Sequence, residues 1–106
     1  MDSPPTGEVA GYTLRLYVAG QSPKSLAAIR NLKKLCEQHL PQPYEVQIVD
    51  LAVNPDLAQR DQIVALPTLV RRLPPPMKRI IGDLSNTDRV LLGLDLLLDA
   101  DGANGG

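Results

Sequence analysis

The side chains that most often carry chemistry are few and isolated in this 106-residue sequence. Cys36 is the only cysteine, so neither a disulfide within the chain nor a cysteine-based metal site can form. His39 is the only histidine, and a lone histidine without clustered carboxylates is a poor metal ligand or general base. The sequence contains no nucleophile–base pair, glycine-rich phosphate loop or paired-carboxylate motif. We therefore expect no catalytic residue, no metal and no cofactor, and predict that the chain is not an enzyme.

The densest group of basic side chains surrounds the three prolines of residues 74–76, and consists of Arg71, Arg72, Lys78 and Arg79. No acidic residue lies among them. Guanidinium groups gathered in this way can bind phosphate or an acidic partner. Charged residues also occur in loops simply because water solvates them. The sequence leaves both interpretations open.

The overall composition argues against nucleic-acid and membrane partners. A net charge of −1 gives no general attraction to nucleic acid, and three tyrosines as the only aromatic residues offer little for base stacking. No apolar stretch approaches the roughly 20 residues that span a bilayer. The first residues carry Asp2 and Glu8 and no basic residue, unlike a signal peptide. We expect a cytoplasmic protein.

The first half of the chain has clear strand and helix periodicity. Residues 13–19 and 44–50 alternate between apolar and polar side chains, which predicts two strands. Between them, Ser22-Pro23 is typical of a helix cap followed by proline at the first helical position. Leu26, Ile29, Leu32, Leu35 and Cys36 then recur at helical spacing, up to about His39. Strand, helix and strand of this length predict a right-handed unit with parallel strands.

The second half is predicted in shorter pieces. Asn54-Pro55-Asp56 should cap a helix that runs to about Val64, and Asn86 should cap a last helix that ends near Leu98. Residues 66–70 and 77–81 are candidate strands, the second ended by Gly82, and residues 73–76 should form an extended loop. Residues 1–11 and 101–106 are predicted to be disordered tails around one domain at 12–100.

Residues 90–98, V-L-L-G-L-D-L-L-L, fit two periodicities. Helical spacing gives one apolar face made of Val90, Leu91, Leu94, Leu97 and Leu98. A period of two gives another made of Leu92, Leu94, Leu96 and Leu98. Leucine-rich runs are often ambiguous, so either the pattern is uninformative or the segment adopts both conformations.

Gly93 and Asp95 are the residues that would set the balance between the two conformations. In a helix interior, Gly93 costs about 1 kcal/mol relative to alanine. Asp95 would lie near the end of that helix, where the helix dipole disfavours an anion. Gly93→Ala and Asp95→Arg should therefore both favour the helical state.

Two short motifs fall where thioredoxin-like proteins have their redox site. Ser22-Pro23-Lys24-Ser25 follows the first strand, at the place of C-x-x-C. Serine cannot form the thiolate that disulfide exchange requires, which excludes that reaction there. Leu66-Pro67-Thr68 opens a strand at the place of the cis-proline in those proteins. Trans is the commoner isomer for any bond to proline, and both isomers remain open.

Five segments taken in order resemble the KaiB family of circadian clock proteins. They are LRLYVAGQSPKSLAAIRNL, YEVQIVDL, NPDLAQRDQIVALPTL, LPPPMKRIIGDLS and RVLLGLDLL, and the resemblance covers about residues 12–98. It implies a metamorphic α/β protein. One state would be a thioredoxin-like βαβαββα monomer, and the other a βαββααβ ground state that assembles as a homotetramer or dimer. The implied fold-switch determinants are Pro67, Pro74, Pro75, Pro76, Gly82, Gly93 and Asp95.

The resemblance also implies partners. The thioredoxin-like state would bind the N-terminal ring of a KaiC-type hexameric ATPase and regulate its phosphorylation cycle and output. KaiA and a sensor histidine kinase are further candidate partners. The same surface would serve an adaptor in stress signalling outside a clock, which is the alternative. Candidate partner-binding residues are Glu45, Gln47, Asp61, Gln62, Arg71, Arg72 and Arg79.

Some positions depart from the family pattern. Gln62 stands where a lysine would help dock on the ATPase, and Glu45 and Gln47 stand where small and basic residues are associated with KaiA. The acidic C-terminal tail is reduced to Asp99 and Asp101. The resemblance therefore implies a KaiC-type partner more directly than KaiA.

Overall fold

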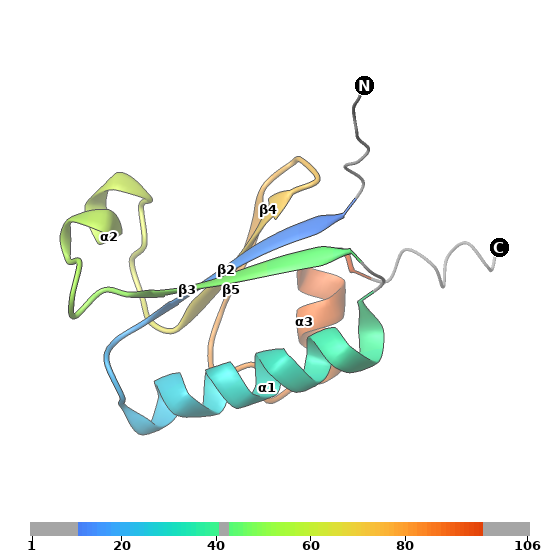
Figure 1. Cartoon of the computed structure of the whole chain (residues 1–106), viewed down its shortest axis with the longest axis horizontal. Coiled ribbons are helices and arrows are strands. Elements are labelled where there is room, and N and C mark those ends of the chain that lie inside the picture. The colour runs from blue at the N-terminus through green and yellow to red at the C-terminus, as the bar shows by residue number, and fades with distance from the viewer. Residues whose placement is uncertain (1–10, 41–42, 97–106) are drawn as a thin grey trace, which may run out of the picture.

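The computed structural model describes residues 11–40 and 43–96 (Figure 1). Apart from Gly11, the predicted tails at 1–11 and 101–106 lie outside these residues, as do Leu97, Leu98 and Asp99. The elements follow the order β2 (Tyr12–Val18), α1 (Pro23–His39), β3 (Tyr44–Asp50), α2 (Asp56–Arg60), β4 (Thr68–Leu73), β5 (Lys78–Ile81) and α3 (Thr87–Gly93). This is the βαβαββα order of a thioredoxin-like fold. No helix within the described ranges is both long and apolar enough to cross a bilayer.

The four strands form one mixed sheet in the order β3-β2-β4-β5. β2 and β3 are parallel, as the strand–helix–strand pattern predicts, and α1 makes the crossover between them. β4 is antiparallel to β2, and β5 is antiparallel to β4. Arg15 on β2 lies opposite Gln47 on β3 and Val70 on β4, so three strands place side chains on the same face at this point.

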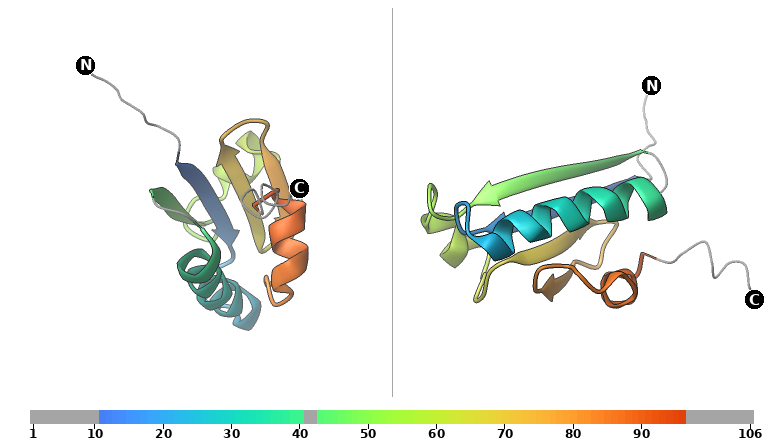
Figure 2. Two further views of the ribbon diagram at one scale, coloured as in Figure 1. Left: turned by 90° about the vertical axis from the view of Figure 1, so that its right-hand side faces the viewer. Right: turned by 90° about the horizontal axis from the view of Figure 1, so that it is seen from below.

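The main core lies between the sheet and the two helices α1 and α3, which cover the same face (Figures 1 and 2). Leu14 and Leu16 from β2 and Leu69 from β4 are fully buried there. From α1, the buried side chains are Ser25, Ala28, Leu32, Leu35 and Cys36. The prediction that Leu26 belongs to this stripe is wrong, because the residue is 42% exposed.

The opposite face of the sheet is covered only in part. Tyr17, Leu51 and Val70 form a second, smaller buried cluster, and Leu57 and Ala58 of α2 pack against it. α2 has only five residues and lies over one end of the sheet. The remaining sheet face therefore has no helix above it among the described residues.

The helix caps agree with the sequence at two of three sites. The Ser22 hydroxyl accepts a hydrogen bond from the Ser25 amide at 3.2 Å, and Asn86 Oδ1 accepts one from the Arg89 amide at 3.1 Å. The cap predicted at Asn54 is wrong, because α2 begins after Pro55 and has no side-chain cap. α2 also ends at Arg60 and not near Val64.

The ends of α2 and α3 explain why both helices are short. After α3, the Leu96 amide donates to the Leu91 carbonyl at 2.8 Å and the Asp95 amide to the Leu92 carbonyl at 3.2 Å. Asp95 has a left-handed backbone, with φ +57°. This is a Schellman motif, which satisfies the last carbonyls of a helix and stops it. The Ile63 and Gln62 amides make the same pair of bonds after α2, and Gln62 has φ +58°.

This geometry corrects two expectations for the last helix. Gly93 is the final residue of α3 and not an interior one, so the full helix-interior cost does not apply to it. A Cβ at Gly93 would lie 3.1 Å from Ile80 Cδ1, so alanine there would require Ile80 to move. Asp95 lies beyond the helix, where a carboxylate still faces the negative end of the dipole. Val90, Leu91 and Leu94 are buried, as the helical reading predicts.

The proline-rich connections join distant parts of the second half. The Leu66–Pro67 bond is cis, which decides the alternative left open by the sequence. The Gly82 amide donates to the Pro67 carbonyl at 2.9 Å, and Gly82 has φ +133°, a region that favours glycine. Leu73–Pro74 and Pro75–Pro76 are also cis. Leu73 belongs to β4, so the predicted loop is only the bend over residues 74–76.

Arg71 is not a surface residue, which corrects its place among the partner-binding candidates. Its side chain points into the main core side of β4 and the residue is only 3% exposed. Its guanidinium donates to the carbonyl oxygens of Leu94 at 3.0 Å, Asp95 at 3.2 Å and Pro76 at 2.9 Å. We refer to this set of bonds as the Arg71 clasp. It joins β4 to the end of α3 and to the proline bend.

The left-handed backbone of Asp95 leads to a prediction about stability. Asp95→Gly should raise the free energy of unfolding by roughly 0.5 to 1 kcal/mol, because glycine adopts positive φ without steric cost, although it also gains freedom in the unfolded chain. Asp95→Asn should give a smaller gain, because it removes only the charge at the helix end. Thermal unfolding of the three proteins measures this order. A lower melting temperature for Asp95→Gly than for wild type would contradict it.

Candidate functional site

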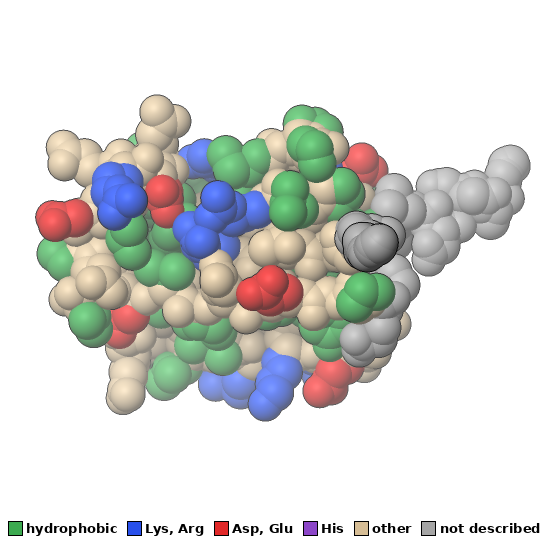
Figure 3. All heavy atoms as spheres, turned by 45° about the horizontal axis from the view of Figure 1, so that its top comes forward, with side chains coloured by type: hydrophobic (Ala, Val, Ile, Leu, Met, Phe, Trp, Pro, Cys, Tyr) green, Lys and Arg blue, Asp and Glu red, His purple; other side chains and the backbone are tan. Residues whose placement is uncertain are grey.

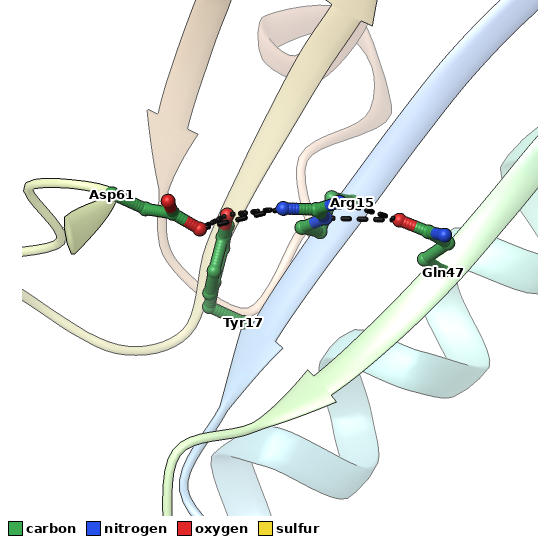
Figure 4. Close-up of polar contacts among 4 residues, drawn as sticks. All are labelled: Arg15, Tyr17, Gln47 and Asp61. Atoms are coloured by element: carbon green, nitrogen blue, oxygen red, sulfur yellow. Dashed lines mark hydrogen bonds and ion pairs between the residues drawn. The ribbon is translucent and has the colours of Figure 1, made fainter. Parts of the chain in front are cut away.

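The uncovered part of the sheet carries a polar network that joins β2, β3 and the end of α2 (Figure 4). Arg15 donates from Nε and Nη2 to Gln47 Oε1 at 3.0 and 2.8 Å. Arg15 Nη1 forms an ion pair with Asp61 Oδ2 at 3.4 Å, and the Tyr17 hydroxyl donates to the same oxygen. These bonds hold Asp61, the residue that follows α2, against β2, an inner strand of the sheet.

The environment of Tyr17 changes its acidity. Burial raises the pKa of the phenol above its ordinary value, and the hydrogen bond to the Asp61 carboxylate raises it further. Arg15 opposes this effect by favouring the phenolate. The neutral hydroxyl is therefore the form that donates to Asp61 and closes the network.

Two shallow hollows flank the network. One, of about 190 Å³, lies beside Tyr17, Gln62, Val70, Met77 and Arg79. The other, of about 690 Å³, lies beside Arg15, Gln47, Ile48, Val49 and Leu57. Both are lined by Arg60, Asp61 and Arg72, so they are neighbours on one surface. We call the residues that line either hollow the arginine face.

The arginine face carries a marked excess of positive charge. Among the described residues that line it, four are arginines and Asp61 is the single carboxylate. Figure 3 shows this side of the molecule, with basic side chains gathered near its centre and left and acidic ones between and below them. The four arginines come from four separate elements, β2, α2, β4 and β5.

The structure brings most of the predicted partner-binding residues together on this face: Gln47, Asp61, Gln62, Arg72 and Arg79. Glu45 lies on the same side of β3, one alternation from Gln47, but lines neither hollow. Arg71 lies on the opposite side, in its clasp.

Sequence reasoning missed Arg15, Tyr17 and Arg60 as members of the face. A signal for the first two was available, because the alternation in residues 13–19 places Arg15 and Tyr17 together, away from Leu14 and Leu16. Arg60 had no such signal, since its position depends on how α2 packs against the sheet.

The other residues that could carry chemistry have structural roles. The Ser25 hydroxyl accepts from the Ala19 amide at 3.0 Å, and the Ser22 hydroxyl donates to it at 2.8 Å, so both serines fix the start of α1. Cys36 is buried, and burial raises the pKa of its thiol to about 11. Within the described part of the chain, no group of three or more His, Cys, Asp or Glu side chains is arranged to hold a metal.

Comparison with known proteins identifies the family. The family model described as the KaiB domain matches residues 15–96. The chain belongs to the KaiB family. The circadian clock oscillator protein KaiB of Gloeothece citriformis is 50% identical over 88 residues, which cover 83% of this chain and 83% of that protein. The KaiB of Thermosynechococcus vestitus is 48% identical over 91 residues, covering 86% of this chain and 84% of that one. As a KaiB protein with such relatives, this chain is a component of a circadian clock.

Solved structures agree on the fold. The N-terminal domain of Synechococcus elongatus SasA has a TM-score of 0.72 at 22% identity, covering 94% of each chain. Mitochondrial thioredoxin 3 from Saccharomyces cerevisiae has a TM-score of 0.63 at 20% identity, covering 79% of this KaiB and 76% of that chain. The described state of this KaiB is therefore thioredoxin-like.

The Tyr17 network predicts a pH dependence. The raised pKa means that the folded state favours the neutral phenol, so this contribution to stability is complete below pH 10 and is lost as pH rises through the folded-state pKa. Tyr17→Phe should therefore flatten the fall in stability above pH 10 and remove a late phase from the tyrosine absorbance titration. Tyr44→Phe is the control and should keep that phase. An unchanged titration in Tyr17→Phe would contradict the assigned network.

Proposed function

We propose that this KaiB binds the N-terminal ATPase ring of a KaiC-type hexamer through the arginine face, and so regulates its phosphorylation cycle and output signalling. The convergence of Gln47, Asp61, Gln62, Arg72 and Arg79 on one uncovered face carries this proposal. These residues come from four separate parts of the chain. An arrangement of this kind suits recognition of a folded surface.

The protein acts by binding and not by catalysis. The serines at the place of a redox dithiol have structural partners, and the only thiol is buried with a raised pKa. A thiolate is the form that attacks a disulfide, so Cys36 is a poor nucleophile. In this proposal KaiA and a sensor histidine kinase are further partners. They would join the complex, or compete with this protein, once the ATPase is bound.

The thioredoxin-like state is the binding-competent one, and a βαββααβ homotetramer or dimer is the resting form. The rearranged part begins near Pro67 and includes the three prolines at 74–76, Gly82, Gly93 and Asp95. A minor competent population lowers the apparent affinity in proportion to that population. Conversion between the two states also requires the bonds of the Arg71 clasp to form or break. We therefore expect binding to be slow.

The test uses the full chain and the KaiC-type ATPase of the same organism. We expect a stable complex that forms over minutes to hours, on the slow scale of assembly steps coupled to refolding. Asp95→Gly should speed its formation, because it favours the helical end of α3. Light scattering and fluorescence anisotropy follow the free oligomer and the complex. No complex with either nucleotide form of the ATPase, or binding complete within milliseconds, would contradict the proposal.

A further inference from the structure

We propose that Arg60 and Arg72 form a carboxylate-binding pair that captures an acidic segment of the partner protein, with Met77 receiving an apolar side chain of that segment. This inference rests on the proposed function, because the segment would belong to the ATPase ring. It adds the chemistry by which the partner would be recognised.

The four arginines of the face divide into two pairs. Arg15 is bound to Gln47, Tyr17 and Asp61, and Arg79 Nη1 donates to the Gln62 carbonyl at 2.8 Å. The Arg60 and Arg72 side chains make no hydrogen bond or ion pair with any residue that the structure describes, and both residues are exposed. Arg15 and Arg79 therefore maintain the face, whereas Arg60 and Arg72 are available to a ligand.

The positions of Arg60 and Arg72 favour binding of one ligand by both side chains. Both line the 190 Å³ hollow and the 690 Å³ hollow, one from the end of α2 and one from β4. Asp61, the single carboxylate among the described residues of the face, already accepts hydrogen bonds from Tyr17 and Arg15. The excess charge of the face is thus left at Arg60 and Arg72, where a planar guanidinium can bind a carboxylate with two parallel hydrogen bonds.

Apolar surface at the rim points to a protein segment and not to a nucleic acid. Met77 is 56% exposed beside the smaller hollow. Methionine adapts to partners of different shape. Tyr17 is the only aromatic residue among the described residues that line the face, and its hydroxyl is engaged with Asp61. Base stacking therefore has no platform here.

The first experiment measures binding to the KaiC-type ring at two salt concentrations. Arg60→Glu/Arg72→Glu should weaken binding at least tenfold and reduce its salt dependence. Arg60→Gln/Arg72→Gln should weaken it less and serves if the charge reversal disturbs α2. Arg30→Glu, an exposed arginine of α1 on the other side of the sheet, is the matched control and should bind like wild type. Wild-type affinity in both double variants would overturn the inference and leave the proposed function intact.

The second experiment does not depend on the ATPase. A hexaglutamate peptide, titrated at low salt and followed by NMR, should shift the Arg60, Arg72 and Met77 resonances of the thioredoxin-like state and leave those around Arg30 unchanged. The double Gln variant should lose these shifts. Shifts that are spread over α1, or binding of a short DNA duplex in preference to the peptide, would overturn the inference even if the ring binds. Localised peptide binding without any ring complex would support this site and refute the proposed partner.

Discussion

The second half of the fold depends on the burial of one guanidinium that has no carboxylate partner among the described residues. Arg71 carries a permanent charge inside the fold, and its described partners are the carbonyl oxygens of Leu94, Asp95 and Pro76. Burial of a charge is costly unless hydrogen bonds and dipoles compensate it. The negative end of α3 supplies that compensation, since Leu94 and Asp95 follow the last turn. Arg71 Nε has no hydrogen-bond partner among the residues that the structure describes, so the compensation there is incomplete.

The clasp also positions the binding surface, because side chains alternate along β4. Arg71 points toward α3 and Arg72, the next residue, points to the opposite face. A one-residue shift of β4 would exchange them and move the charge of the arginine face into the core. Arg79 plays a similar part on β5, where it binds the carbonyl of Gln62 after α2. Two arginines thus hold the ends of the two short helices, one on each side of the sheet.

Sequence patterns predicted the elements that depend on neighbouring residues. The parallel β2–β3 pair, the Ser22 cap and the Asn86 cap follow from alternation and capping preferences within short segments. The early ends of α2 and α3 could not be predicted, because Gln62 and Asp95 occupy left-handed positions that usually carry glycine. Arg71 could not be told from Arg72 in a run of basic residues, since only the register of β4 separates them. The arginine face could not be predicted either, because it depends on how α2 packs against the sheet, and no local sequence pattern indicates that packing.

The most direct test of this account is amide hydrogen exchange in Arg71→Met, with Arg72→Met as the matched control. The account predicts that Arg71→Met loses protection at the Leu94 and Leu96 amides, which close the end of α3, while amides of β2 and β3 stay protected. Arg72→Met should leave all of these amides as protected as in wild type, because its side chain makes no contact with α3 carbonyls. Unchanged protection of the Leu94 and Leu96 amides in Arg71→Met would contradict the central role of the clasp.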